Sequence, residues 1–222
     1  MSEMRSELRR RIQNARLRIH EYKGNAYFIS KHNKAQSGQR TMIYLLRHGA
    51  DDDMRLGGWS DAGLSPVGIE QVRRASEKIC FGNYNIRRIF SSDLPRAKET
   101  AEIIASKLKL NVLLIEEFRE TNNGDLAGIS KTKFQTDYPG LYYSSLQWDQ
   151  RYPNGESPAL FFNRIKNAWE SFKQKEIGAP GNTLLVTHGG VIDVILCLEK
   201  GKIYTNKCVN FRVDHAEIIR AV

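Results

Sequence analysis

The sequence contains few cysteines, and they show no arrangement typical of a metal site or a disulfide framework. Cys80, Cys197 and Cys208 are an odd number and lack the spacing of metal-ligating cysteines. We therefore expect three reduced thiols. None of them is a candidate catalytic residue.

Long apolar runs are also missing. No stretch approaches the roughly 18 apolar residues that span a bilayer. The N-terminus lacks the apolar core of a signal peptide, and there is no internal repeat or low-complexity tract. We therefore expect a cytoplasmic protein without a transmembrane segment. Its 222 residues provide for one α/β domain with a full core and a small appendage.

Positive charge is unevenly distributed along the chain. The net charge is +9, but residues 1–40 hold ten Lys and Arg against three Glu, a net charge of +7, which leaves +2 for the other 182 residues. The larger part of the chain is thus nearly neutral. This excludes reading the whole protein as a nucleic-acid binder from its isoelectric point.

The N-terminal 40 residues predict a basic helical extension. Apolar residues spaced four, three and four apart lie on one helical face over residues 5–22: Leu8, Ile12, Ala15 and Ile19. Arginines occupy much of the remainder. The apolar stripe favours packing on the domain or on a second subunit, and the alternative is attachment to RNA or an anionic membrane surface. Residues 24–40 are predicted to be a linker, which leaves 41–222 as the main domain.

Strand and helix patterns alternate through the main domain. Apolar runs predict strands over 42–46, 86–90, 111–115 and 182–187. Helices are expected over 66–79, 95–108, 130–138, 157–173 and 190–198, the first with Ser65 as N-cap. Residues 209–213 and 216–221 resemble a closing hairpin. This alternation predicts an α/β domain with a mostly parallel sheet.

Two histidines follow two of the predicted strands. Arg47-His48-Gly49 comes directly after the strand at 42–46, and His188-Gly189-Gly190 after the strand at 182–187. Ligand sites of open α/β sheets lie at the carboxyl ends of strands, so both histidines are expected in one site. The neighbouring arginine indicates an anionic ligand.

These residue types suit phosphoryl transfer through a histidine. Neutral imidazole is a competent nucleophile near neutral pH, which makes His48 the candidate nucleophile. Arg47 and Arg96 can each pair two phosphate oxygens. His188 can donate a hydrogen bond to the phosphate beside the start of the following helix. Glu120, after the third strand, is the best-placed carboxylate for general acid catalysis.

At this point the chain resembles the histidine phosphatase superfamily, the phosphoglycerate-mutase-like group. Five blocks carry the resemblance in order: 47–49 with 58–68, 91–101, 120–128, 155–157 and 187–190. The resemblance implies that His48 is phosphorylated and the phosphohistidine then hydrolysed. Further, it implies a phosphate pocket of Arg47, Arg96, His188 and Gly189, and Glu120 as proton donor. It implies no metal and no cofactor, a small phosphorylated metabolite as substrate, and helices on both faces of the sheet.

The chain departs from this group after Gly49. Members with mutase activity usually continue with Glu-Ser or Gln-Ser and an asparagine, whereas this chain has Ala50 and three aspartates, 51–53, in a shorter segment. These aspartates are interpreted as a solvated loop, or as groups that repel highly anionic substrates or hold a cation. Arg55 is either a phosphate contact or a solvated loop residue. The usual Gly-x-Trp-x-Gly lacks its tryptophan at 124–128.

Three functions remain open from the sequence. The first is a metal-independent phosphomonoesterase, the second a phosphoglycerate-mutase-type phosphotransferase, and the third a non-catalytic binding protein on the same scaffold. The short segment after Gly49 counts against the second and the intact set of candidate residues against the third. An aromatic stretch at 138–152 is read as lid packing, or as a surface for an aryl or sugar group. His20, His32 and His215 are expected on the surface.

Overall fold

The chain divides into two units, Met1–Gln39 and Arg40–Val222. The computed structural model describes residues 18–22, 25–29 and 41–222. For the first two ranges it gives the pairing of two strands. The functional residues predicted from the sequence all belong to the second unit.

The described part of the N-terminal unit is a two-stranded sheet. β1 (Arg18–Tyr22) pairs antiparallel with β2 (Asn25–Ile29), so that Tyr22 lies opposite Asn25. The helix predicted over 5–22 is therefore wrong at 18–22, and the linker predicted over 24–40 is wrong at 25–29. The β-branched and aromatic residues in both segments favour strands, and a two-residue connection ending in glycine is typical of hairpins. Residues 5–17 and 30–40 lie outside the described ranges.

The second unit is built on a five-stranded sheet with the strand order β5-β4-β6-β3-β7. The strands are β3 (Ile43–Arg47), β4 (Ile86–Ser91), β5 (Val112–Leu114), β6 (Asn182–Thr187) and β7 (Ile218–Arg220). The first four run parallel, and β7 runs antiparallel to β3. The predicted α/β fold with a mostly parallel sheet is confirmed.

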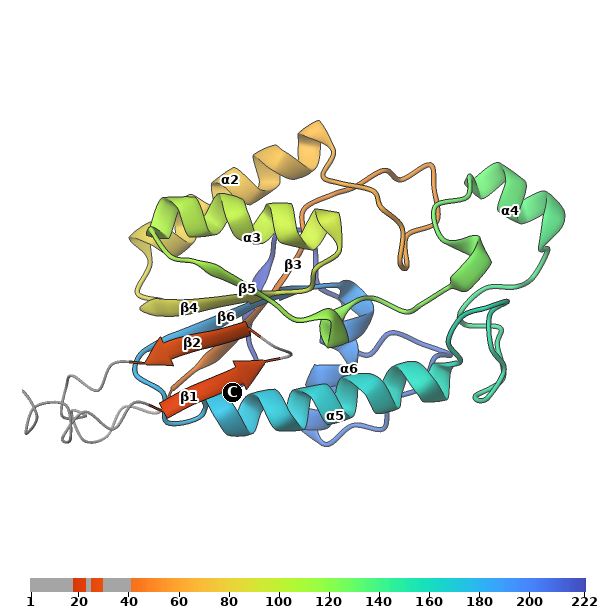
Figure 1. The fold of residues 1–222 in the computed structure, drawn as a ribbon. Coiled ribbons are helices and arrows are strands. Elements are labelled where there is room, and N and C mark those ends of the chain that lie inside the picture. Colours follow the sequence, from red (N-terminus) through yellow and green to blue (C-terminus); the bar gives the residue numbers. More distant parts are fainter. Residues whose placement is uncertain (1–17, 23–24, 30–40) are drawn as a thin grey trace, which may run out of the picture. The chain divides into compact units, whose positions relative to one another are not determined.

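Helices cover both faces of this sheet (Figure 1). α2 (Pro66–Phe81) and α3 (Pro95–Leu108) lie on one face, and α5 (Pro158–Glu176) and α6 (Gly189–Lys200) on the other. The short helix α4 (Lys131–Asp137) and the 3₁₀ turns η1 (Glu116–Phe118) and η2 (Gly124–Leu126) belong to the connection from β5 to α5. Ser65 caps α2 as expected, since its hydroxyl accepts the Gly68 N–H.

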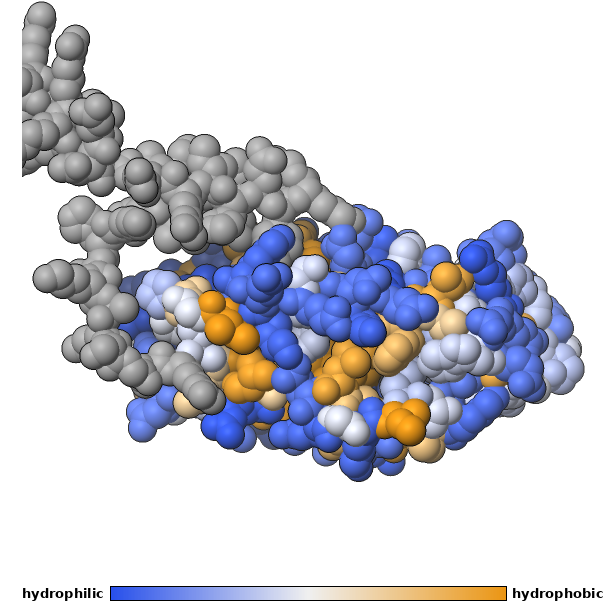
Figure 2. All heavy atoms as spheres, turned by 90° about the horizontal axis from the view of Figure 1, so that it is seen from below, coloured by the Kyte–Doolittle hydropathy of each residue, from blue (hydrophilic) through white to orange (hydrophobic). Residues whose placement is uncertain are grey.

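The outer surfaces of these helices match their amphipathic sequences. The face covered by α5 and α6 is mostly hydrophilic, with separate hydrophobic patches (Figure 2). Scattered exposed apolar side chains such as Leu160 and Ile177 are normal on a protein surface. Among the described residues, no helix is both long and apolar enough to cross a bilayer.

The predicted closing hairpin is wrong in its first half. Residues 209–213 form a loop, in which the N–H groups of Asn210 and Phe211 donate to the Asp193 carboxylate at 3.0 and 2.8 Å. β7 pairs instead with β3, with Ile219 opposite Leu45. The buried Asp193 carboxylate on α6 thus binds the backbone of 209–213 in a loop, and the edge of β3 is paired with β7 instead. These contacts outweigh the local strand propensity of 209–213.

The segment after β3 packs closely against the start of α2, and two glycines, Gly49 and Gly68, allow this contact. A Cβ on Gly68 would lie 2.0 Å from the Ala50 carbonyl oxygen, and one on Gly49 would lie 2.6 Å from the Gly68 carbonyl oxygen. The backbone N–H of Ser65 also donates to the Ala50 oxygen at 2.8 Å. The start of α2 therefore presses directly against the backbone that follows His48.

This contact predicts the effect of Gly68→Ala. The added methyl group must push Ala50 away, so we expect unfolding in urea to show a loss of about 1–3 kcal/mol. Val67→Ala is the control, because the Val67 side chain is 64% exposed on the same turn. It should cost less than about 0.5 kcal/mol. A Gly68→Ala variant as stable as the wild type would contradict the close contact.

Candidate active site

Three neighbouring strands deliver the candidate residues to one edge of the sheet. β6 lies between β4 and β3, and Arg47 on β3 is opposite Thr187 on β6. The pairing continues past the strands, since the N–H of His48 donates to the Thr187 oxygen at 3.0 Å and that of Ser92 to the Val186 oxygen at 3.0 Å. The segments that begin with His48, His188 and Ser92 therefore leave the sheet side by side, as expected for the carboxyl ends of parallel strands.

His48 is buried with a defined orientation. Its Nδ1 lies 2.7 Å from the Gly49 carbonyl oxygen, which can only accept, so Nδ1 carries the hydrogen. Its Nε2 therefore presents a lone pair, and the Nε of Arg96 donates to it at 3.3 Å. Burial, followed by the charge of Arg96, places the pKa of His48 well below its usual value. His48 is thus a neutral imidazole near pH 7.

Arg96 is the most enclosed cation of the site, with 2% of its side chain exposed. It lies in the first turn of α3, and its Nη2 donates to the Gly58 carbonyl oxygen at 2.7 Å. Its Nε lies 3.3 Å from the Asp51 carboxylate. Burial lowers the pKa of Arg96, and the charges of Asp51 and Glu120 oppose this effect.

Arg47 is held by a segment far along the chain. Its Nη1 donates to the Val213 carbonyl oxygen at 2.9 Å, and its Nη2 lies 2.9 Å from Nε2 of His215. Its Nε is buried and has no hydrogen-bond partner among the described residues. An unpaired buried guanidinium N–H is costly, so this nitrogen is suited to an anionic ligand.

His188 has a similarly unsatisfied nitrogen. The residue is fully buried, and its Nε2 lies 2.8 Å from the Ser92 hydroxyl. Its Nδ1 has no partner within the described part of the chain. The ring centroid lies 5.1 Å from that of His48. Burial, with the charge of Arg96 second, lowers the pKa of His188, so it can serve as a neutral donor.

The N-terminus of α6 adds backbone donors to this site. The helix begins at Gly189 with His188 at the N-cap position. A Cβ on Gly189 would lie at an ordinary van der Waals distance of 3.5 Å from the Arg47 Nε, so the start of α6 lies beside this guanidinium. Helix N-termini favour anions through their free N–H groups and dipole.

Glu120 is positioned by its neighbours on both sides. Its carboxylate accepts N–H groups from Thr121 and Gly190, each at 3.1 Å. Its backbone oxygen accepts from the Trp59 indole at 2.7 Å and from Arg164 at 3.0 Å. Burial lowers the pKa of both Arg47 and Arg96, and the nearby charge of Glu120 opposes this effect. The structure therefore brings Glu120 near the two arginines, and its role as general acid stays a prediction.

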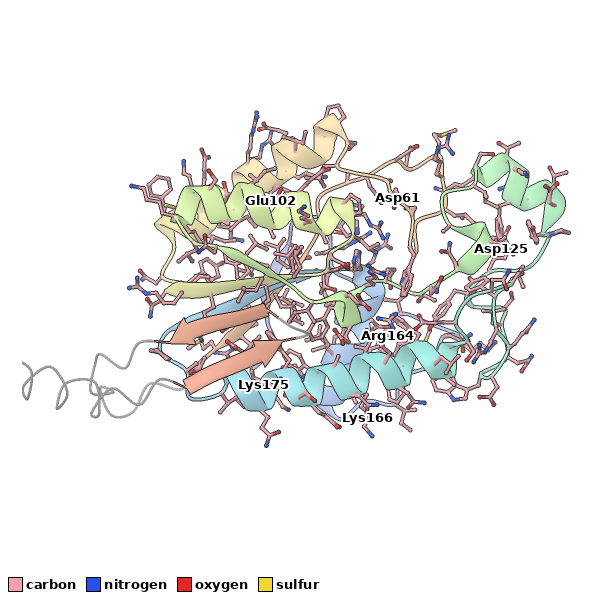
Figure 3. All side chains as sticks on the ribbon, viewed as in Figure 1. Asp61, Glu102, Asp125, Arg164, Lys166 and Lys175 are labelled. Atoms are coloured by element: carbon pink, nitrogen blue, oxygen red, sulfur yellow. The ribbon has the colours of Figure 1, made fainter. Side chains whose placement is uncertain are left out.

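Arg164 acts as a clamp on the segment that carries Glu120. It lies on the side of α5 that faces this segment, whereas Lys166 lies on the opposite side (Figure 3). Besides Glu120, it donates to the Glu117 and Arg119 carbonyl oxygens at 2.7 and 3.0 Å. Its partner is Glu156, at 2.7 Å. This ion pair explains the Gly-Glu-Ser block at 155–157, whose purpose the sequence does not reveal.

Two residues lie closer to the site than the sequence predicts. His215, expected on the surface, is half-buried against Arg47, and its ring centroid is 5.6 Å from that of His48. Asp51, interpreted first as part of a solvated loop, pairs with Arg96 with 19% of its side chain exposed. Ser92, which carries no prediction of its own, positions His188. Such contacts between distant segments leave no local pattern in the sequence.

The site contains one group of metal-ligand type. His48, Asp51 and His215 place ligand atoms within 4.8 Å of one another. Each of them also contacts an arginine, Arg96 for the first two and Arg47 for His215. Because two guanidinium charges disfavour a cation, the arrangement suits an anion better.

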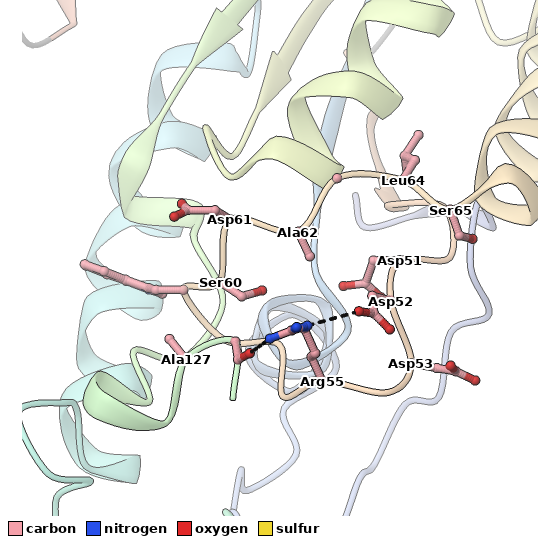
Figure 4. Close-up of a pocket in the computed structure, with 13 residues that line it drawn as sticks. Asp51, Asp52, Asp53, Arg55, Ser60, Asp61, Ala62, Leu64, Ser65 and Ala127 are labelled. Carbon is pink, nitrogen blue, oxygen red and sulfur yellow. Dashed lines mark hydrogen bonds and ion pairs between the residues drawn. The ribbon is translucent and has the colours of Figure 1, made fainter. Parts of the chain in front are cut away.

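A pocket of about 780 Å³ opens beside the site. Its lining comes mainly from 51–55 and 59–65, with Ala127 and Gly128 from the loop after β5 (Figure 4). Arg55 is exposed there, donates to the Gly128 carbonyl oxygen at 2.8 Å and pairs with Asp52 at 3.4 Å. These contacts do not involve the candidate phosphate ligands, so the role of Arg55 as a phosphate ligand stays a prediction.

The aromatic stretch at 138–152 mainly packs. Tyr152 belongs to a buried cluster with Leu126, Phe134 and Leu146, against which Tyr138 and Tyr143 pack. The hydroxyl of Tyr143 is 3.1 Å from that of Tyr204. Tyr142 and Trp148 remain exposed. The lid-packing interpretation therefore accounts for most of these rings.

Comparison with known proteins agrees with this geometry. The sequence pattern of the histidine phosphatase superfamily (branch 1) matches residues 43–221. Phosphoglycerate mutase-like protein 4 of Arabidopsis thaliana is 34% identical over 157 residues, which cover 68% of this chain and 67% of the relative. Probable phosphoglycerate mutase GpmB of Proteus mirabilis is 30% identical, over 78% of this chain and 84% of the relative.

The solved structures give the same result. A mycobacterial glucosyl-3-phosphoglycerate phosphatase superposes with a TM-score of 0.67 at 26% identity, over 82% of this chain and 90% of that one. From the family pattern, the relatives and the fold together, we conclude that this chain belongs to the histidine phosphatase superfamily.

Proposed function

We propose that the protein is a metal-independent phosphomonoesterase that hydrolyses its substrate through a phosphohistidine on His48. The main support is the convergence of one nucleophile with two unsatisfied nitrogens. The neutral His48 presents its Nε2 lone pair, while Arg47 Nε and His188 Nδ1 are buried without partners in the described residues. A phosphate group would satisfy both and would meet Arg96 as well.

In the first step, the His48 Nε2 lone pair attacks the phosphorus. The bond from phosphorus to the ester oxygen breaks as the nitrogen–phosphorus bond forms, and the leaving oxygen takes a proton from the Glu120 carboxyl group. Arg47 and Arg96 neutralise charge on the non-bridging oxygens, and His188 donates one hydrogen bond. The Nδ1–H of His48 stays on the Gly49 oxygen, which holds the ring in place.

In the second step, water releases the phosphate. The Glu120 carboxylate takes a proton from the water as its oxygen attacks phosphorus, and the bond to Nε2 breaks. Inorganic phosphate leaves, Glu120 is protonated again and His48 returns to the neutral form. The clamp by Arg164 and Trp59 keeps the carboxylate in one position through both steps.

A phosphotransferase of the mutase type is the second candidate, because two of the relatives are named phosphoglycerate mutase or mutase-like. Its phosphoenzyme must be protected from water until the product returns. The short segment after Gly49 and the open pocket beside it count against such protection. The fate of the phosphate distinguishes the two, since a mutase leaves it on the product. The intact set of candidate residues counts against a non-catalytic binding protein.

His48→Ala should abolish phosphate release. With p-nitrophenyl phosphate and EDTA present, we expect wild-type turnover and a decrease of at least about 10³-fold in the variant, because the covalent step is lost. Release of inorganic phosphate is the measurement, with unfolding of both proteins compared as a control for folding. Wild-type activity that EDTA removes would contradict the metal-independent route. Equal activity of the two proteins would exclude His48 as nucleophile.

The neutral state of the two buried histidines predicts how stability depends on pH. Their pKa values are lowered by burial, so between about pH 6.5 and the lower folded values the unfolded chain binds more protons. The free energy of unfolding should therefore fall as pH drops below about 6.5. In His188→Gln one of these groups is gone, and the fall should be shallower. Urea unfolding between pH 8 and pH 5.5 tests this, and stability that rises on acidification would contradict it.

A further inference from the structure

Asp51 occupies the position where a bound phosphate must meet Arg96. Its Oδ2 lies 3.3 Å from the Arg96 Nε, and the same nitrogen donates to His48 Nε2 at 3.3 Å. A phosphate on His48 requires this edge of the guanidinium. The carboxylate and the phosphate therefore compete for one donor, and the Asp51 carboxylate must leave this nitrogen when substrate binds.

With Glu120 protonated for the first step, Arg47, Arg96 and Asp51 leave the site one net positive charge before substrate binds. Among the described residues, Arg47 and Arg96 are the arginines that affect the pKa of His48. Burial lowers their own pKa values, and the charges of Glu120 and Asp51 oppose this effect. The two buried histidines are neutral. A phosphate dianion alone therefore makes the site negative, and a further anionic group on the substrate would be opposed by Asp51 at short range.

The pocket beside the site is negative as well. Four carboxylates and one guanidinium line it: Asp51, Asp52, Asp53, Asp61 and Arg55. The guanidinium is already paired with Asp52 and bonded to Gly128. Asp51 and Asp52 point into the pocket, whereas Asp53 points away from it (Figure 4). A positively charged group would be attracted here and a carboxylate repelled.

We propose that Asp51 determines specificity, so that the site selects phosphate monoesters whose alcohol carries an ammonium group and rejects those whose alcohol carries a carboxylate. This inference rests on the proposed phosphatase function. After phosphate displaces Asp51 from Arg96, the carboxylate faces the leaving group and an ammonium group restores its ion pair. Phosphoglycerate-like substrates would instead bring a second anion against Asp51.

Three two-carbon esters that differ in charge test the proposal: O-phosphoethanolamine, ethyl phosphate and phosphoglycolate. With EDTA present, kcat/KM of the wild type should fall in this order, by about tenfold for each unit of charge. In Asp51→Asn the three values should come within about threefold of one another. Asp53→Asn removes the same charge two residues away and should keep the wild-type order.

Each result decides the question. Equal or reversed values in the wild type would overturn the proposed selection, and an unchanged order in a folded Asp51→Asn would overturn the role of Asp51. If the wild type hydrolyses neither ethyl phosphate nor p-nitrophenyl phosphate, the proposed hydrolysis fails. In that case the dissociation constants of the same three esters, measured by calorimetry, test the selection by itself. The same order and its loss in Asp51→Asn would support it, and equal or reversed constants would overturn it.

Discussion

The parallel pairing of β3 with β6 is the constraint on which the site depends. It places Arg47 opposite Thr187, so that the residues after each strand leave the sheet together. A shift of one residue would turn every side chain of β3 to the other face. Leucines of both strands are buried beneath the helices on the two faces, so this shift would disrupt the packing of both layers. The core thus fixes the distance between the two histidines.

Burial gives these residues their chemistry. Desolvation keeps both imidazoles neutral, while the same enclosure strengthens the attraction of Arg47 and Arg96 for an anion. The cost of enclosing two guanidinium groups is offset by Asp51, Glu120 and backbone carbonyl oxygens. These groups therefore offset much of the positive charge of the two arginines before a ligand binds. The charge of the ligand then changes the total charge of the site.

Much of this arrangement could be predicted from the sequence. Strand periodicity, the serine and proline at helix starts and the residues after the strands identified the parallel sheet and the meeting of His48 with His188. His215 and the position of Asp51 could not be predicted, because they depend on contacts between segments with no local pattern. The strand at 18–22 was missed since helical spacing and strand-forming residue types coexist there, and pairing with 25–29 decides between them.

The contacts that hold Arg47 also determine when the phosphate site is complete. Val213 and His215 bind this guanidinium, and they follow Arg47 in the chain by 166 and 168 residues. A chain that has paired β3 with β6 but has not yet packed the segment after α6 lacks both. Arg47 then has neither partner, and the anion site is incomplete although most of the sheet exists. The phosphate clamp is therefore complete only when this segment packs against the paired strands.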